Sequence, residues 1–128
     1  MVVTGFTCAT DATINGPVTV RAGAALVTTR TTINGPVTTT GAAGILLADS
    51  TINGPVRIAN TTDAISLIDV TTAGPVHLSA NTTGTDTPLL ADNTIRGPLS
   101  CTGNNPTPSN LGIANTVHGP RTAQCAAL

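Results

Sequence analysis

A Gly-Pro pair recurs six times along this chain of 128 residues, and it limits the possible folds more than any other feature. Successive pairs are 19, 19, 20, 23 and 22 residues apart. Three copies read TINGPV, and the later ones drift to TTAGPV, TIRGPL and TVHGPR. A repeat of about 20 residues is typical of a solenoid, in which each repeat forms one coil and stacks on the next.

Apolar and polar residues alternate around each Gly-Pro pair, as they do in a strand with one buried face. A further apolar run, such as Ile45-Leu46-Leu47, precedes this pattern in several repeats, so we expect three short strands per coil. A 19-residue coil at about 3.3 Å per residue has a perimeter of about 60 Å, which suits three sides. The apolar columns are Ile14, Ile33, Ile52, Ile95 and Val117 (Thr72 in the fourth repeat), then Val18, Val37, Val56, Val76 and Leu99 (Arg121 in the last), then Val20, Ile58, Leu78 and Cys101 (Thr39 in the second).

The sequence therefore predicts an all-β fold, a single-domain parallel β-solenoid with about five to six coils of 19–23 residues. We expect a right-handed β-helix, from strand twist and the usual hand of parallel crossovers. Residues 1–99 are predicted to form coils, and residues 100–128 the last coil and a C-terminal cap of the same domain. The chain lacks the 10–15-residue helical segments of βαβ and leucine-rich repeats, and it lacks the glycine at every third residue of collagen.

We place each Gly-Pro pair at a corner between strands. Proline has no N–H to donate, which breaks hydrogen bonding on a flat face and does little harm at a bend. Glycine avoids the steric restriction on a residue before proline, so replacing Gly35 with valine should strain the corner. The corners are Gly16-Pro17, Gly35-Pro36, Gly54-Pro55 and Gly74-Pro75, followed by Gly97-Pro98 and Gly119-Pro120.

Two polar columns flank the inward isoleucine column and should face outward. The first is threonine in all six repeats, namely Thr13, Thr32, Thr51, Thr71, Thr94 and Thr116. The second reads Asn15, Asn34, Asn53, Ala73, Arg96 and His118. A rank of threonines on a flat β face resembles the arrays of solenoidal ice-binding proteins, although those faces usually carry two regular threonine columns. The structural alternative is that β-branched threonine favours strands, and that the asparagines form a short amide ladder.

A column of acidic residues lies five positions before the glycine of the first five Gly-Pro pairs: Asp11, Asp49, Asp69 and Asp92, with Arg30 in the second repeat. Stacked carboxylates can bind Ca²⁺, but the glycine-rich nonapeptide of metal-binding solenoids is missing. Aspartate also favours turns, and Arg30 would lie between Asp11 and Asp49. We expect these to be turn residues, with no metal and no cofactor.

Many parallel β-helices are polysaccharide lyases or hydrolases, which need paired carboxylates or a base beside metal-binding carboxylates. This chain has no Glu and no Lys, and its two histidines, His77 and His118, belong to different coils. Asp63 with Asp69, or Asp86 with Asp92, are the pairs that could meet. We expect turn residues here too, and no enzyme.

Charge and hydropathy exclude two further classes. With five arginines and a net charge of −1, the chain cannot form the basic stripe that nucleic acids require. Its uninterrupted apolar runs are far shorter than the roughly 20 residues that span a bilayer. We expect neither a nucleic-acid partner nor a membrane span.

The three cysteines are Cys8, Cys101 and Cys125. Cys101 and Cys125 fall at nearly the same angular position of adjacent coils, so a disulfide is geometrically reasonable, and two buried free thiols are the alternative. Cys8 is left over, either buried as a small apolar residue or paired with another chain or with residues upstream. Disulfides indicate an oxidising compartment, and 26 threonines without a lysine suit a secreted or cell-surface protein.

The segment Ser100–Cys125, SCTGNNPTPSNLGIANTVHGPRTAQC, resembles the C-terminal end of secreted actinomycete proteins with degenerate β-helix repeats of the TVxGxVxV type. The likeness lies in Cys101, the Asn-Pro-rich loop, NTVxGPR and Cys125. It implies the fold, export and the disulfide, and it implies no activity. Met1–Thr10 has neither the basic start nor the apolar stretch of a signal peptide, so we expect Met1 to begin a mature or shortened chain.

The N-terminal coil carries no segment that would cover it, and an open solenoid end is a template for another strand. Two copies meeting end to end would make a filament, which a C-terminal cap would limit, and side-by-side contact between copies is the other form of self-assembly. We therefore expect a non-catalytic extracellular structural module, either a rigid stalk or a self-assembling surface protein. The alternative is a binding module that uses the flat Thr/Asn face for ice or for cell-wall polysaccharide.

Overall fold

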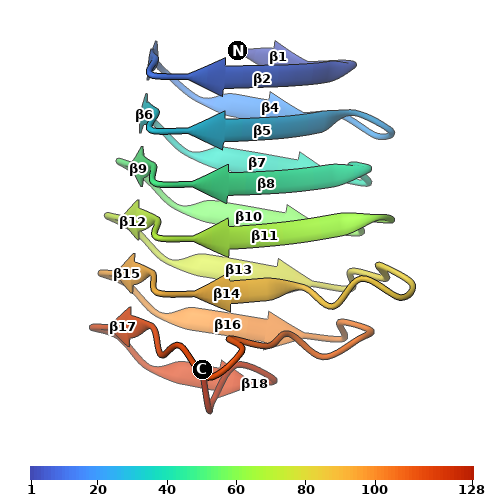
Figure 1. Ribbon diagram of the computed structural model, residues 1–128, viewed down its shortest axis with the longest axis vertical. Coiled ribbons are helices and arrows are strands. Elements are labelled where there is room, and N and C mark those ends of the chain that lie inside the picture. The colour runs from blue at the N-terminus through green and yellow to red at the C-terminus, as the bar shows by residue number, and fades with distance from the viewer.

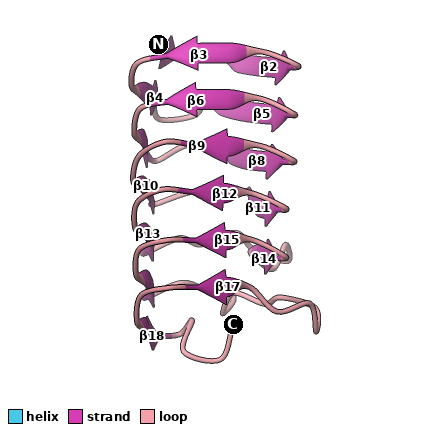
Figure 2. Cartoon of the chain, turned by 90° about the vertical axis from the view of Figure 1, so that its left-hand side faces the viewer, coloured by secondary structure: helices cyan, strands magenta, loops and turns pink.

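Three parallel sheets line the three sides of a solenoid of about six coils in the computed structural model, which describes residues 1–128 (Figures 1 and 2). Each full coil contributes one strand to each side. As the chain descends, the strands in front run to the left and those behind run to the right, so the winding is right-handed (Figure 1). The expected all-β solenoid with three strands per coil is confirmed.

The sheets take their strands in chain order. Sheet A contains β1 (Val2–Val3), β4 (Val18–Val20), β7 (Val37–Thr40), β10 (Val56–Ala59), β13 (Val76–Ser79), β16 (Leu99–Thr102) and β18 (Arg121–Ala123). Sheet B contains β2 (Phe6–Thr10), β5 (Ala25–Thr29), β8 (Gly44–Ala48), β11 (Ala64–Ile68) and β14 (Leu89–Ala91). Sheet C contains β3 (Thr13–Asn15), β6 (Thr32–Asn34), β9 (Thr51–Ile52), β12 (Thr71–Thr72), β15 (Thr94–Ile95) and β17 (Thr116–Val117).

The core is a stack of inward side chains in strict register. Val18 pairs with Val37, and Val37 with Val56, so every apolar column of the sequence becomes a vertical row inside the solenoid. Most members of the predicted columns are fully buried. Arg121 is the last member of its column and is exposed, as expected for a charged residue at the end of an otherwise apolar column.

The Gly-Pro corners join sheet C to sheet A, as predicted, and stacking between coils adds a reason for glycine that the sequence did not reveal. Among the Gly-Pro glycines only Gly16 has a positive φ, so a left-handed backbone is not the shared reason. A Cβ on Gly35 would lie 2.5 Å from the carbonyl oxygen of Gly16 and 2.8 Å from the nitrogen of Pro17. Glycine is required because the corners of successive coils stack backbone on backbone.

Proline still takes part in the ladder through its carbonyl group. The N–H of Val18 donates to the carbonyl of Pro36 at 2.9 Å, and the N–H of Val37 donates to that of Pro55 at 3.0 Å. The missing proline N–H lies at the bend, where the loss of one donor leaves the flat faces intact. The coils are therefore bonded to one another through the corners as well as along the sides.

The lower end of the solenoid is covered by irregular chain. Sheet B has no sixth strand, and its place below β14 is taken by the loop between β16 and β17. In that loop the N–H of Ser109 donates to the carbonyl of Pro88, and the N–H of Leu90 donates to Ser109, both at 2.9 Å. The last residues then pass beneath the core, where Leu128 is nearly buried (Figure 2).

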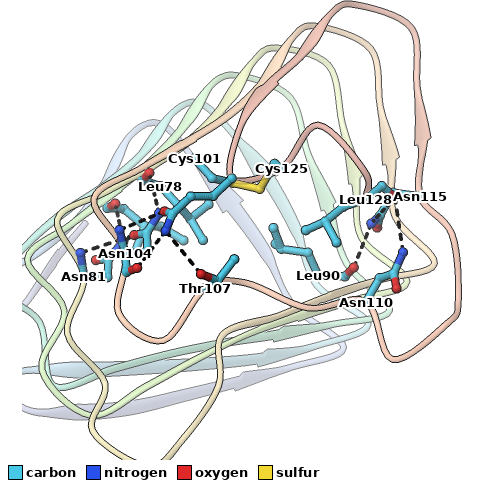
Figure 3. The surroundings of a disulfide bond; sticks show 12 residues. Leu78, Asn81, Leu90, Cys101, Asn104, Thr107, Asn110, Asn115, Cys125 and Leu128 are labelled. Atoms are coloured by element: carbon cyan, nitrogen blue, oxygen red, sulfur yellow. Dashed lines mark hydrogen bonds between the residues drawn. A yellow bond between two sulfur atoms is a disulfide. The ribbon is translucent and has the colours of Figure 1, made fainter.

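A disulfide between Cys101 and Cys125 fastens this lower end. The two Cα atoms lie 5.3 Å apart, and both residues are fully buried in the core cluster. Figure 3 shows the bond, which joins Cys101 of β16, the last but one strand of sheet A, to Cys125 in the segment that closes the base. The predicted bridge is confirmed, and it indicates that the protein matures in an oxidising environment.

Candidate binding face on sheet C

The threonine column forms the outer surface of sheet C. Thr13 pairs with Thr32, Thr32 with Thr51, and the row continues to Thr116 in unbroken register. The isoleucines between the two polar columns point inward, and Ile33 and Ile52 are fully buried. Neighbouring strands lie about 4.8 Å apart, so the hydroxyl-bearing side chains repeat at that spacing along the rod.

The asparagine column lies beside it and forms an amide ladder over the first three coils. The Nδ2 of Asn34 donates to Oδ1 of Asn15 at 2.9 Å, and the Nδ2 of Asn53 donates to Oδ1 of Asn34 at 2.7 Å. All three side chains are exposed. The central amide, that of Asn34, donates to one neighbour and accepts from the other, which fixes its orientation. The structure thus combines the two alternatives, because the asparagines face outward and also bond to one another.

The ordered part of this face ends at the third coil. Ala73, Arg96 and His118 follow in the asparagine column, and all three are exposed. Arg96 and His118 project as large polar side chains from a surface whose other side chains are short and uncharged. The flat Thr/Asn array therefore consists of Thr13, Thr32, Thr51, Asn15, Asn34 and Asn53.

The acidic column lies at the corner between sheets B and C, in the left-handed backbone region. Asp11, Asp49, Asp69 and Asp92 have φ between 48° and 55°, and Arg30 has φ 48°. Aspartate tolerates this conformation better than most residues, so the turn at each of these corners explains why aspartate recurs there. In no part of the structure do three or more His, Cys, Asp or Glu side chains gather as a metal site would require.

Charges along this corner perturb two carboxyl groups in opposite directions. Nε of Arg30 donates to Oδ1 of Asp11 at 2.6 Å and Nη2 donates to Oδ2 at 3.1 Å, and this hydrogen bonding lowers the pKa of Asp11. Side-chain hydrogen bonding with Asp49 raises the pKa of Asp69, and the charges of Asp49 and Asp92 add to the effect. Arg30 is bonded to Asp11 alone, rather than shared between two carboxylates as its place in the sequence suggested.

The carboxylate pairs considered for catalysis do not meet. Asp63 precedes β11 and Asp69 follows it, so the length of a five-residue strand, about 17 Å, separates them. Asp86 and Asp92 likewise lie at opposite ends of β14, one before the strand and one after it. The carboxylates that do approach each other are Asp49 and Asp69, on stacked coils, and their proximity arises from the corner column.

The outer face of sheet B is a surface that the sequence interpretation missed. Its central column carries Cys8, Val27, Leu46, Ser66 and Leu89, and the columns beside it carry no charged side chain. Phe6, Leu46 and Ile68 are exposed there. The signal lay in runs such as Ile45-Leu46-Leu47, because strict alternation in a strand must turn the middle residue of an apolar triplet outward.

Two buried amide ladders in the lower coils were also not predicted. Asn81 Nδ2 donates to Oδ1 of Asn104 at 2.7 Å, and Asn104 Nδ2 donates to Oε1 of Gln124 at 3.0 Å (Figure 3). On the other corner, Asn93 Nδ2 donates to Oδ1 of Asn115 at 2.9 Å. These amides also bond to backbone groups, so they hold the longer, less regular coils in register.

Cys8 is exposed and free, which excludes one of the two alternatives for it, a buried small apolar residue. It points outward from the middle of β2, the first strand of sheet B. The shallow hollows of the surface lie elsewhere. One lies over Thr19 and Thr38 on sheet A. The other is lined by β11, β14, Asp86 of the loop before β14, and Leu111 of the loop between β16 and β17.

No protein-family model matches the chain, and neither does any curated protein or solved structure. No helix of the structure is long and apolar enough to cross a membrane.

Proposed function

We propose that the protein is a non-catalytic structural module that acts outside the cell as a short, rigid rod. The observation that carries this proposal is the continuous bonding between coils: hydrogen bonds link successive coils on three sides and through the corners. Seven strands of sheet A at about 4.8 Å make a length of about 30 Å. A rod bonded in this way resists bending, because any bend must lengthen hydrogen bonds along one whole side.

The extracellular part of the proposal has two supports. The Cys101–Cys125 disulfide suits an oxidising compartment, and such bonds are rare in the cytosol. The C-terminal segment resembles that of secreted actinomycete proteins. A secreted or cell-surface location accounts for both.

Rod and filament differ in what they require of the ends. A filament of head-to-tail copies needs two open, complementary ends. The lower end is covered by the segment that carries Cys125 and Leu128, which favours the discrete rod. Negative-stain electron microscopy of the oxidised protein should therefore show discrete particles a few nanometres across. Filaments of uniform width would overturn the rod and favour a self-assembling surface protein.

A second candidate function is supported by the Thr/Asn array of the first three coils. The amide ladder fixes its asparagines, so a flat, pre-ordered, uncharged surface is available to ice or to a cell-wall polysaccharide without a large loss of side-chain entropy. In this second function the outer face of sheet C binds a ligand, whereas in the first the whole solenoid acts as a structural rod.

Tyrosine substitutions on two faces separate these functions. Thr32→Tyr with Thr51→Tyr places bulk on the Thr/Asn array, while Thr19→Tyr with Thr38→Tyr places the same bulk on the outer face of sheet A. If the array binds, only the first pair should abolish inhibition of ice recrystallisation or co-sedimentation with insoluble cell-wall polysaccharide. Unchanged unfolding temperatures in both pairs would show that the fold survives. Absence of binding by the wild-type protein, or equal loss in both pairs, would remove the binding function.

A further inference from the structure

The upper end of sheet B presents a free strand edge. Strand β2 pairs only with β5, and no strand lies beyond it. The N–H of Ala25 donates to the carbonyl of Gly5 at 3.1 Å, and the N–H of Asp11 donates to the carbonyl of Thr29 at 3.0 Å. Because backbone groups alternate in direction along a strand, the odd-numbered residues of β2 bond to β5. The N–H and C=O groups of Phe6, Cys8 and Thr10 therefore point away from the molecule along the free edge.

This edge has none of the features that keep free edges apart. Proteins usually block an edge strand with a charged side chain, a proline, a bulge or very short length. Strand β2 reads FTCAT over five residues, as long as any strand in the molecule, and contains neither charge nor proline. An unprotected edge of this length is a template for a further strand.

On sheets B and C the core is also more exposed at this end. Thr7 and Ala9 point inward from β2 and are only half-buried, whereas Leu26 and Thr28, one coil below them, are fully buried. Half-buried Ile14 and fully buried Ile33 show the same difference on sheet C. The uppermost inward side chains on sheet B are small. A strand of another molecule can therefore approach β2 to the spacing of hydrogen-bonded strands, about 4.8 Å, without a clash.

The two ends are unlike, so a contact between two copies must join like ends rather than head to tail. The base is closed by the C-terminal segment, so it offers the open end no matching surface. We propose that two copies of this chain join at their N-terminal ends about a two-fold axis, with β2 antiparallel to β2 of the second copy. Such a contact is isologous and closes on itself, so it yields a dimer and no filament.

Symmetry and strand length favour one register. Centring the pair on Cys8 places Phe6 opposite Thr10 of the second copy and brings the free groups of Phe6, Cys8 and Thr10 together. Each of these opposed pairs can exchange both backbone hydrogen bonds, which gives about six bonds in all. Shifting the register leaves part of this short edge unpaired. The dimer would double the length of sheet B and bring the two exposed Cys8 side chains close together.

The dimer goes beyond the proposed function, and it can fail while the rod stands. Analytical ultracentrifugation over a concentration series should show a monomer–dimer equilibrium for the wild-type protein. Phe6→Pro removes an N–H that is unused within the monomer, and Gly5 before it tolerates a following proline. We expect this variant to weaken dimerisation at least tenfold. Phe6→Lys, which places a charge beside the edge, should act in the same direction.

Leu46→Lys is the matched control. Leu46 faces outward on the same sheet, two coils below β2, so edge pairing predicts an unchanged dimer. Loss of the dimer in Leu46→Lys would mean that the apolar faces of sheet B pack against each other, and it would overturn the proposal. Far-ultraviolet circular dichroism and thermal unfolding of each variant separate loss of the dimer from loss of the fold.

Thiol cross-linking tests the register independently. Cys8 is the one free thiol, since Cys101 and Cys125 are bonded to each other. A short bismaleimide should link two copies rapidly through Cys8. A variant that combines Cys8→Ser with Ser66→Cys moves the thiol down the same outward column, and it should cross-link far more slowly. A wild-type protein that stays monomeric at all concentrations, or equal cross-linking from both positions, would refute the dimer.

Discussion

Gly35→Ala is expected to destabilise the protein by about 3 kcal/mol or more, at or beyond the upper end of ordinary overpacking effects. The added Cβ would lie 2.5 Å from the carbonyl oxygen of Gly16 and 2.6 Å from its carbonyl carbon. Both are backbone atoms, so no side-chain rotation relieves the contact. The corner can open only by lengthening hydrogen bonds such as that from Val18 to the carbonyl of Pro36.

Urea unfolding followed by circular dichroism measures this loss, and Gly5→Ala is the matched control. A Cβ on Gly5 meets nothing within 4 Å, so that change should alter the free energy of unfolding by less than about 0.5 kcal/mol. Gly35→Val should be at least as damaging as Gly35→Ala. Similar stability for Gly35→Ala and Gly5→Ala would mean that the coils do not stack through their glycines, and the corner assignment would be wrong.

Removal of the disulfide should have the next largest effect. The double variant Cys101→Ala with Cys125→Ala is expected to lower the free energy of unfolding by about 3 to 3.5 kcal/mol, from the chain entropy released by opening a loop of this size. The bond joins residues 24 apart in the sequence and holds the segment that covers the base. The loss should therefore be felt most in the last coil.

Native-state hydrogen exchange locates this effect, together with a denaturant titration. Amides of β16 and of the residues after it should exchange faster in the double variant, while those of β5 and β8 keep most of their protection. Cys8→Ala, which changes an exposed free thiol, serves as the control and should be close to neutral. Uniformly faster exchange in all coils would show that the bond stabilises the rod as a whole rather than its base.

Some features of this molecule follow from local residue patterns. A fixed repeat of Gly-Pro, with apolar residues at alternate positions on either side, leaves only stacked coils with inward columns as a way to bury Ile33, Val37 and their equivalents. The angular match of Cys101 and Cys125 followed from the same register. Repetition makes these predictions safe, because any error in orientation would be repeated in every coil and would expose a whole apolar column.

Other features depend on atoms from neighbouring coils, which a single repeat does not contain. Glycine at the corners is needed because Gly16 and Gly35 meet across the stack, and no property of one Gly-Pro pair reveals this contact. The amide ladders likewise join residues about one coil apart, such as Asn34 and Asn15. The open upper edge and the closed base, which decide how copies can meet, exist only once the coils are stacked. The repeat pattern is enough to specify the coil, whereas the contacts between coils and at the two ends depend on packing in three dimensions.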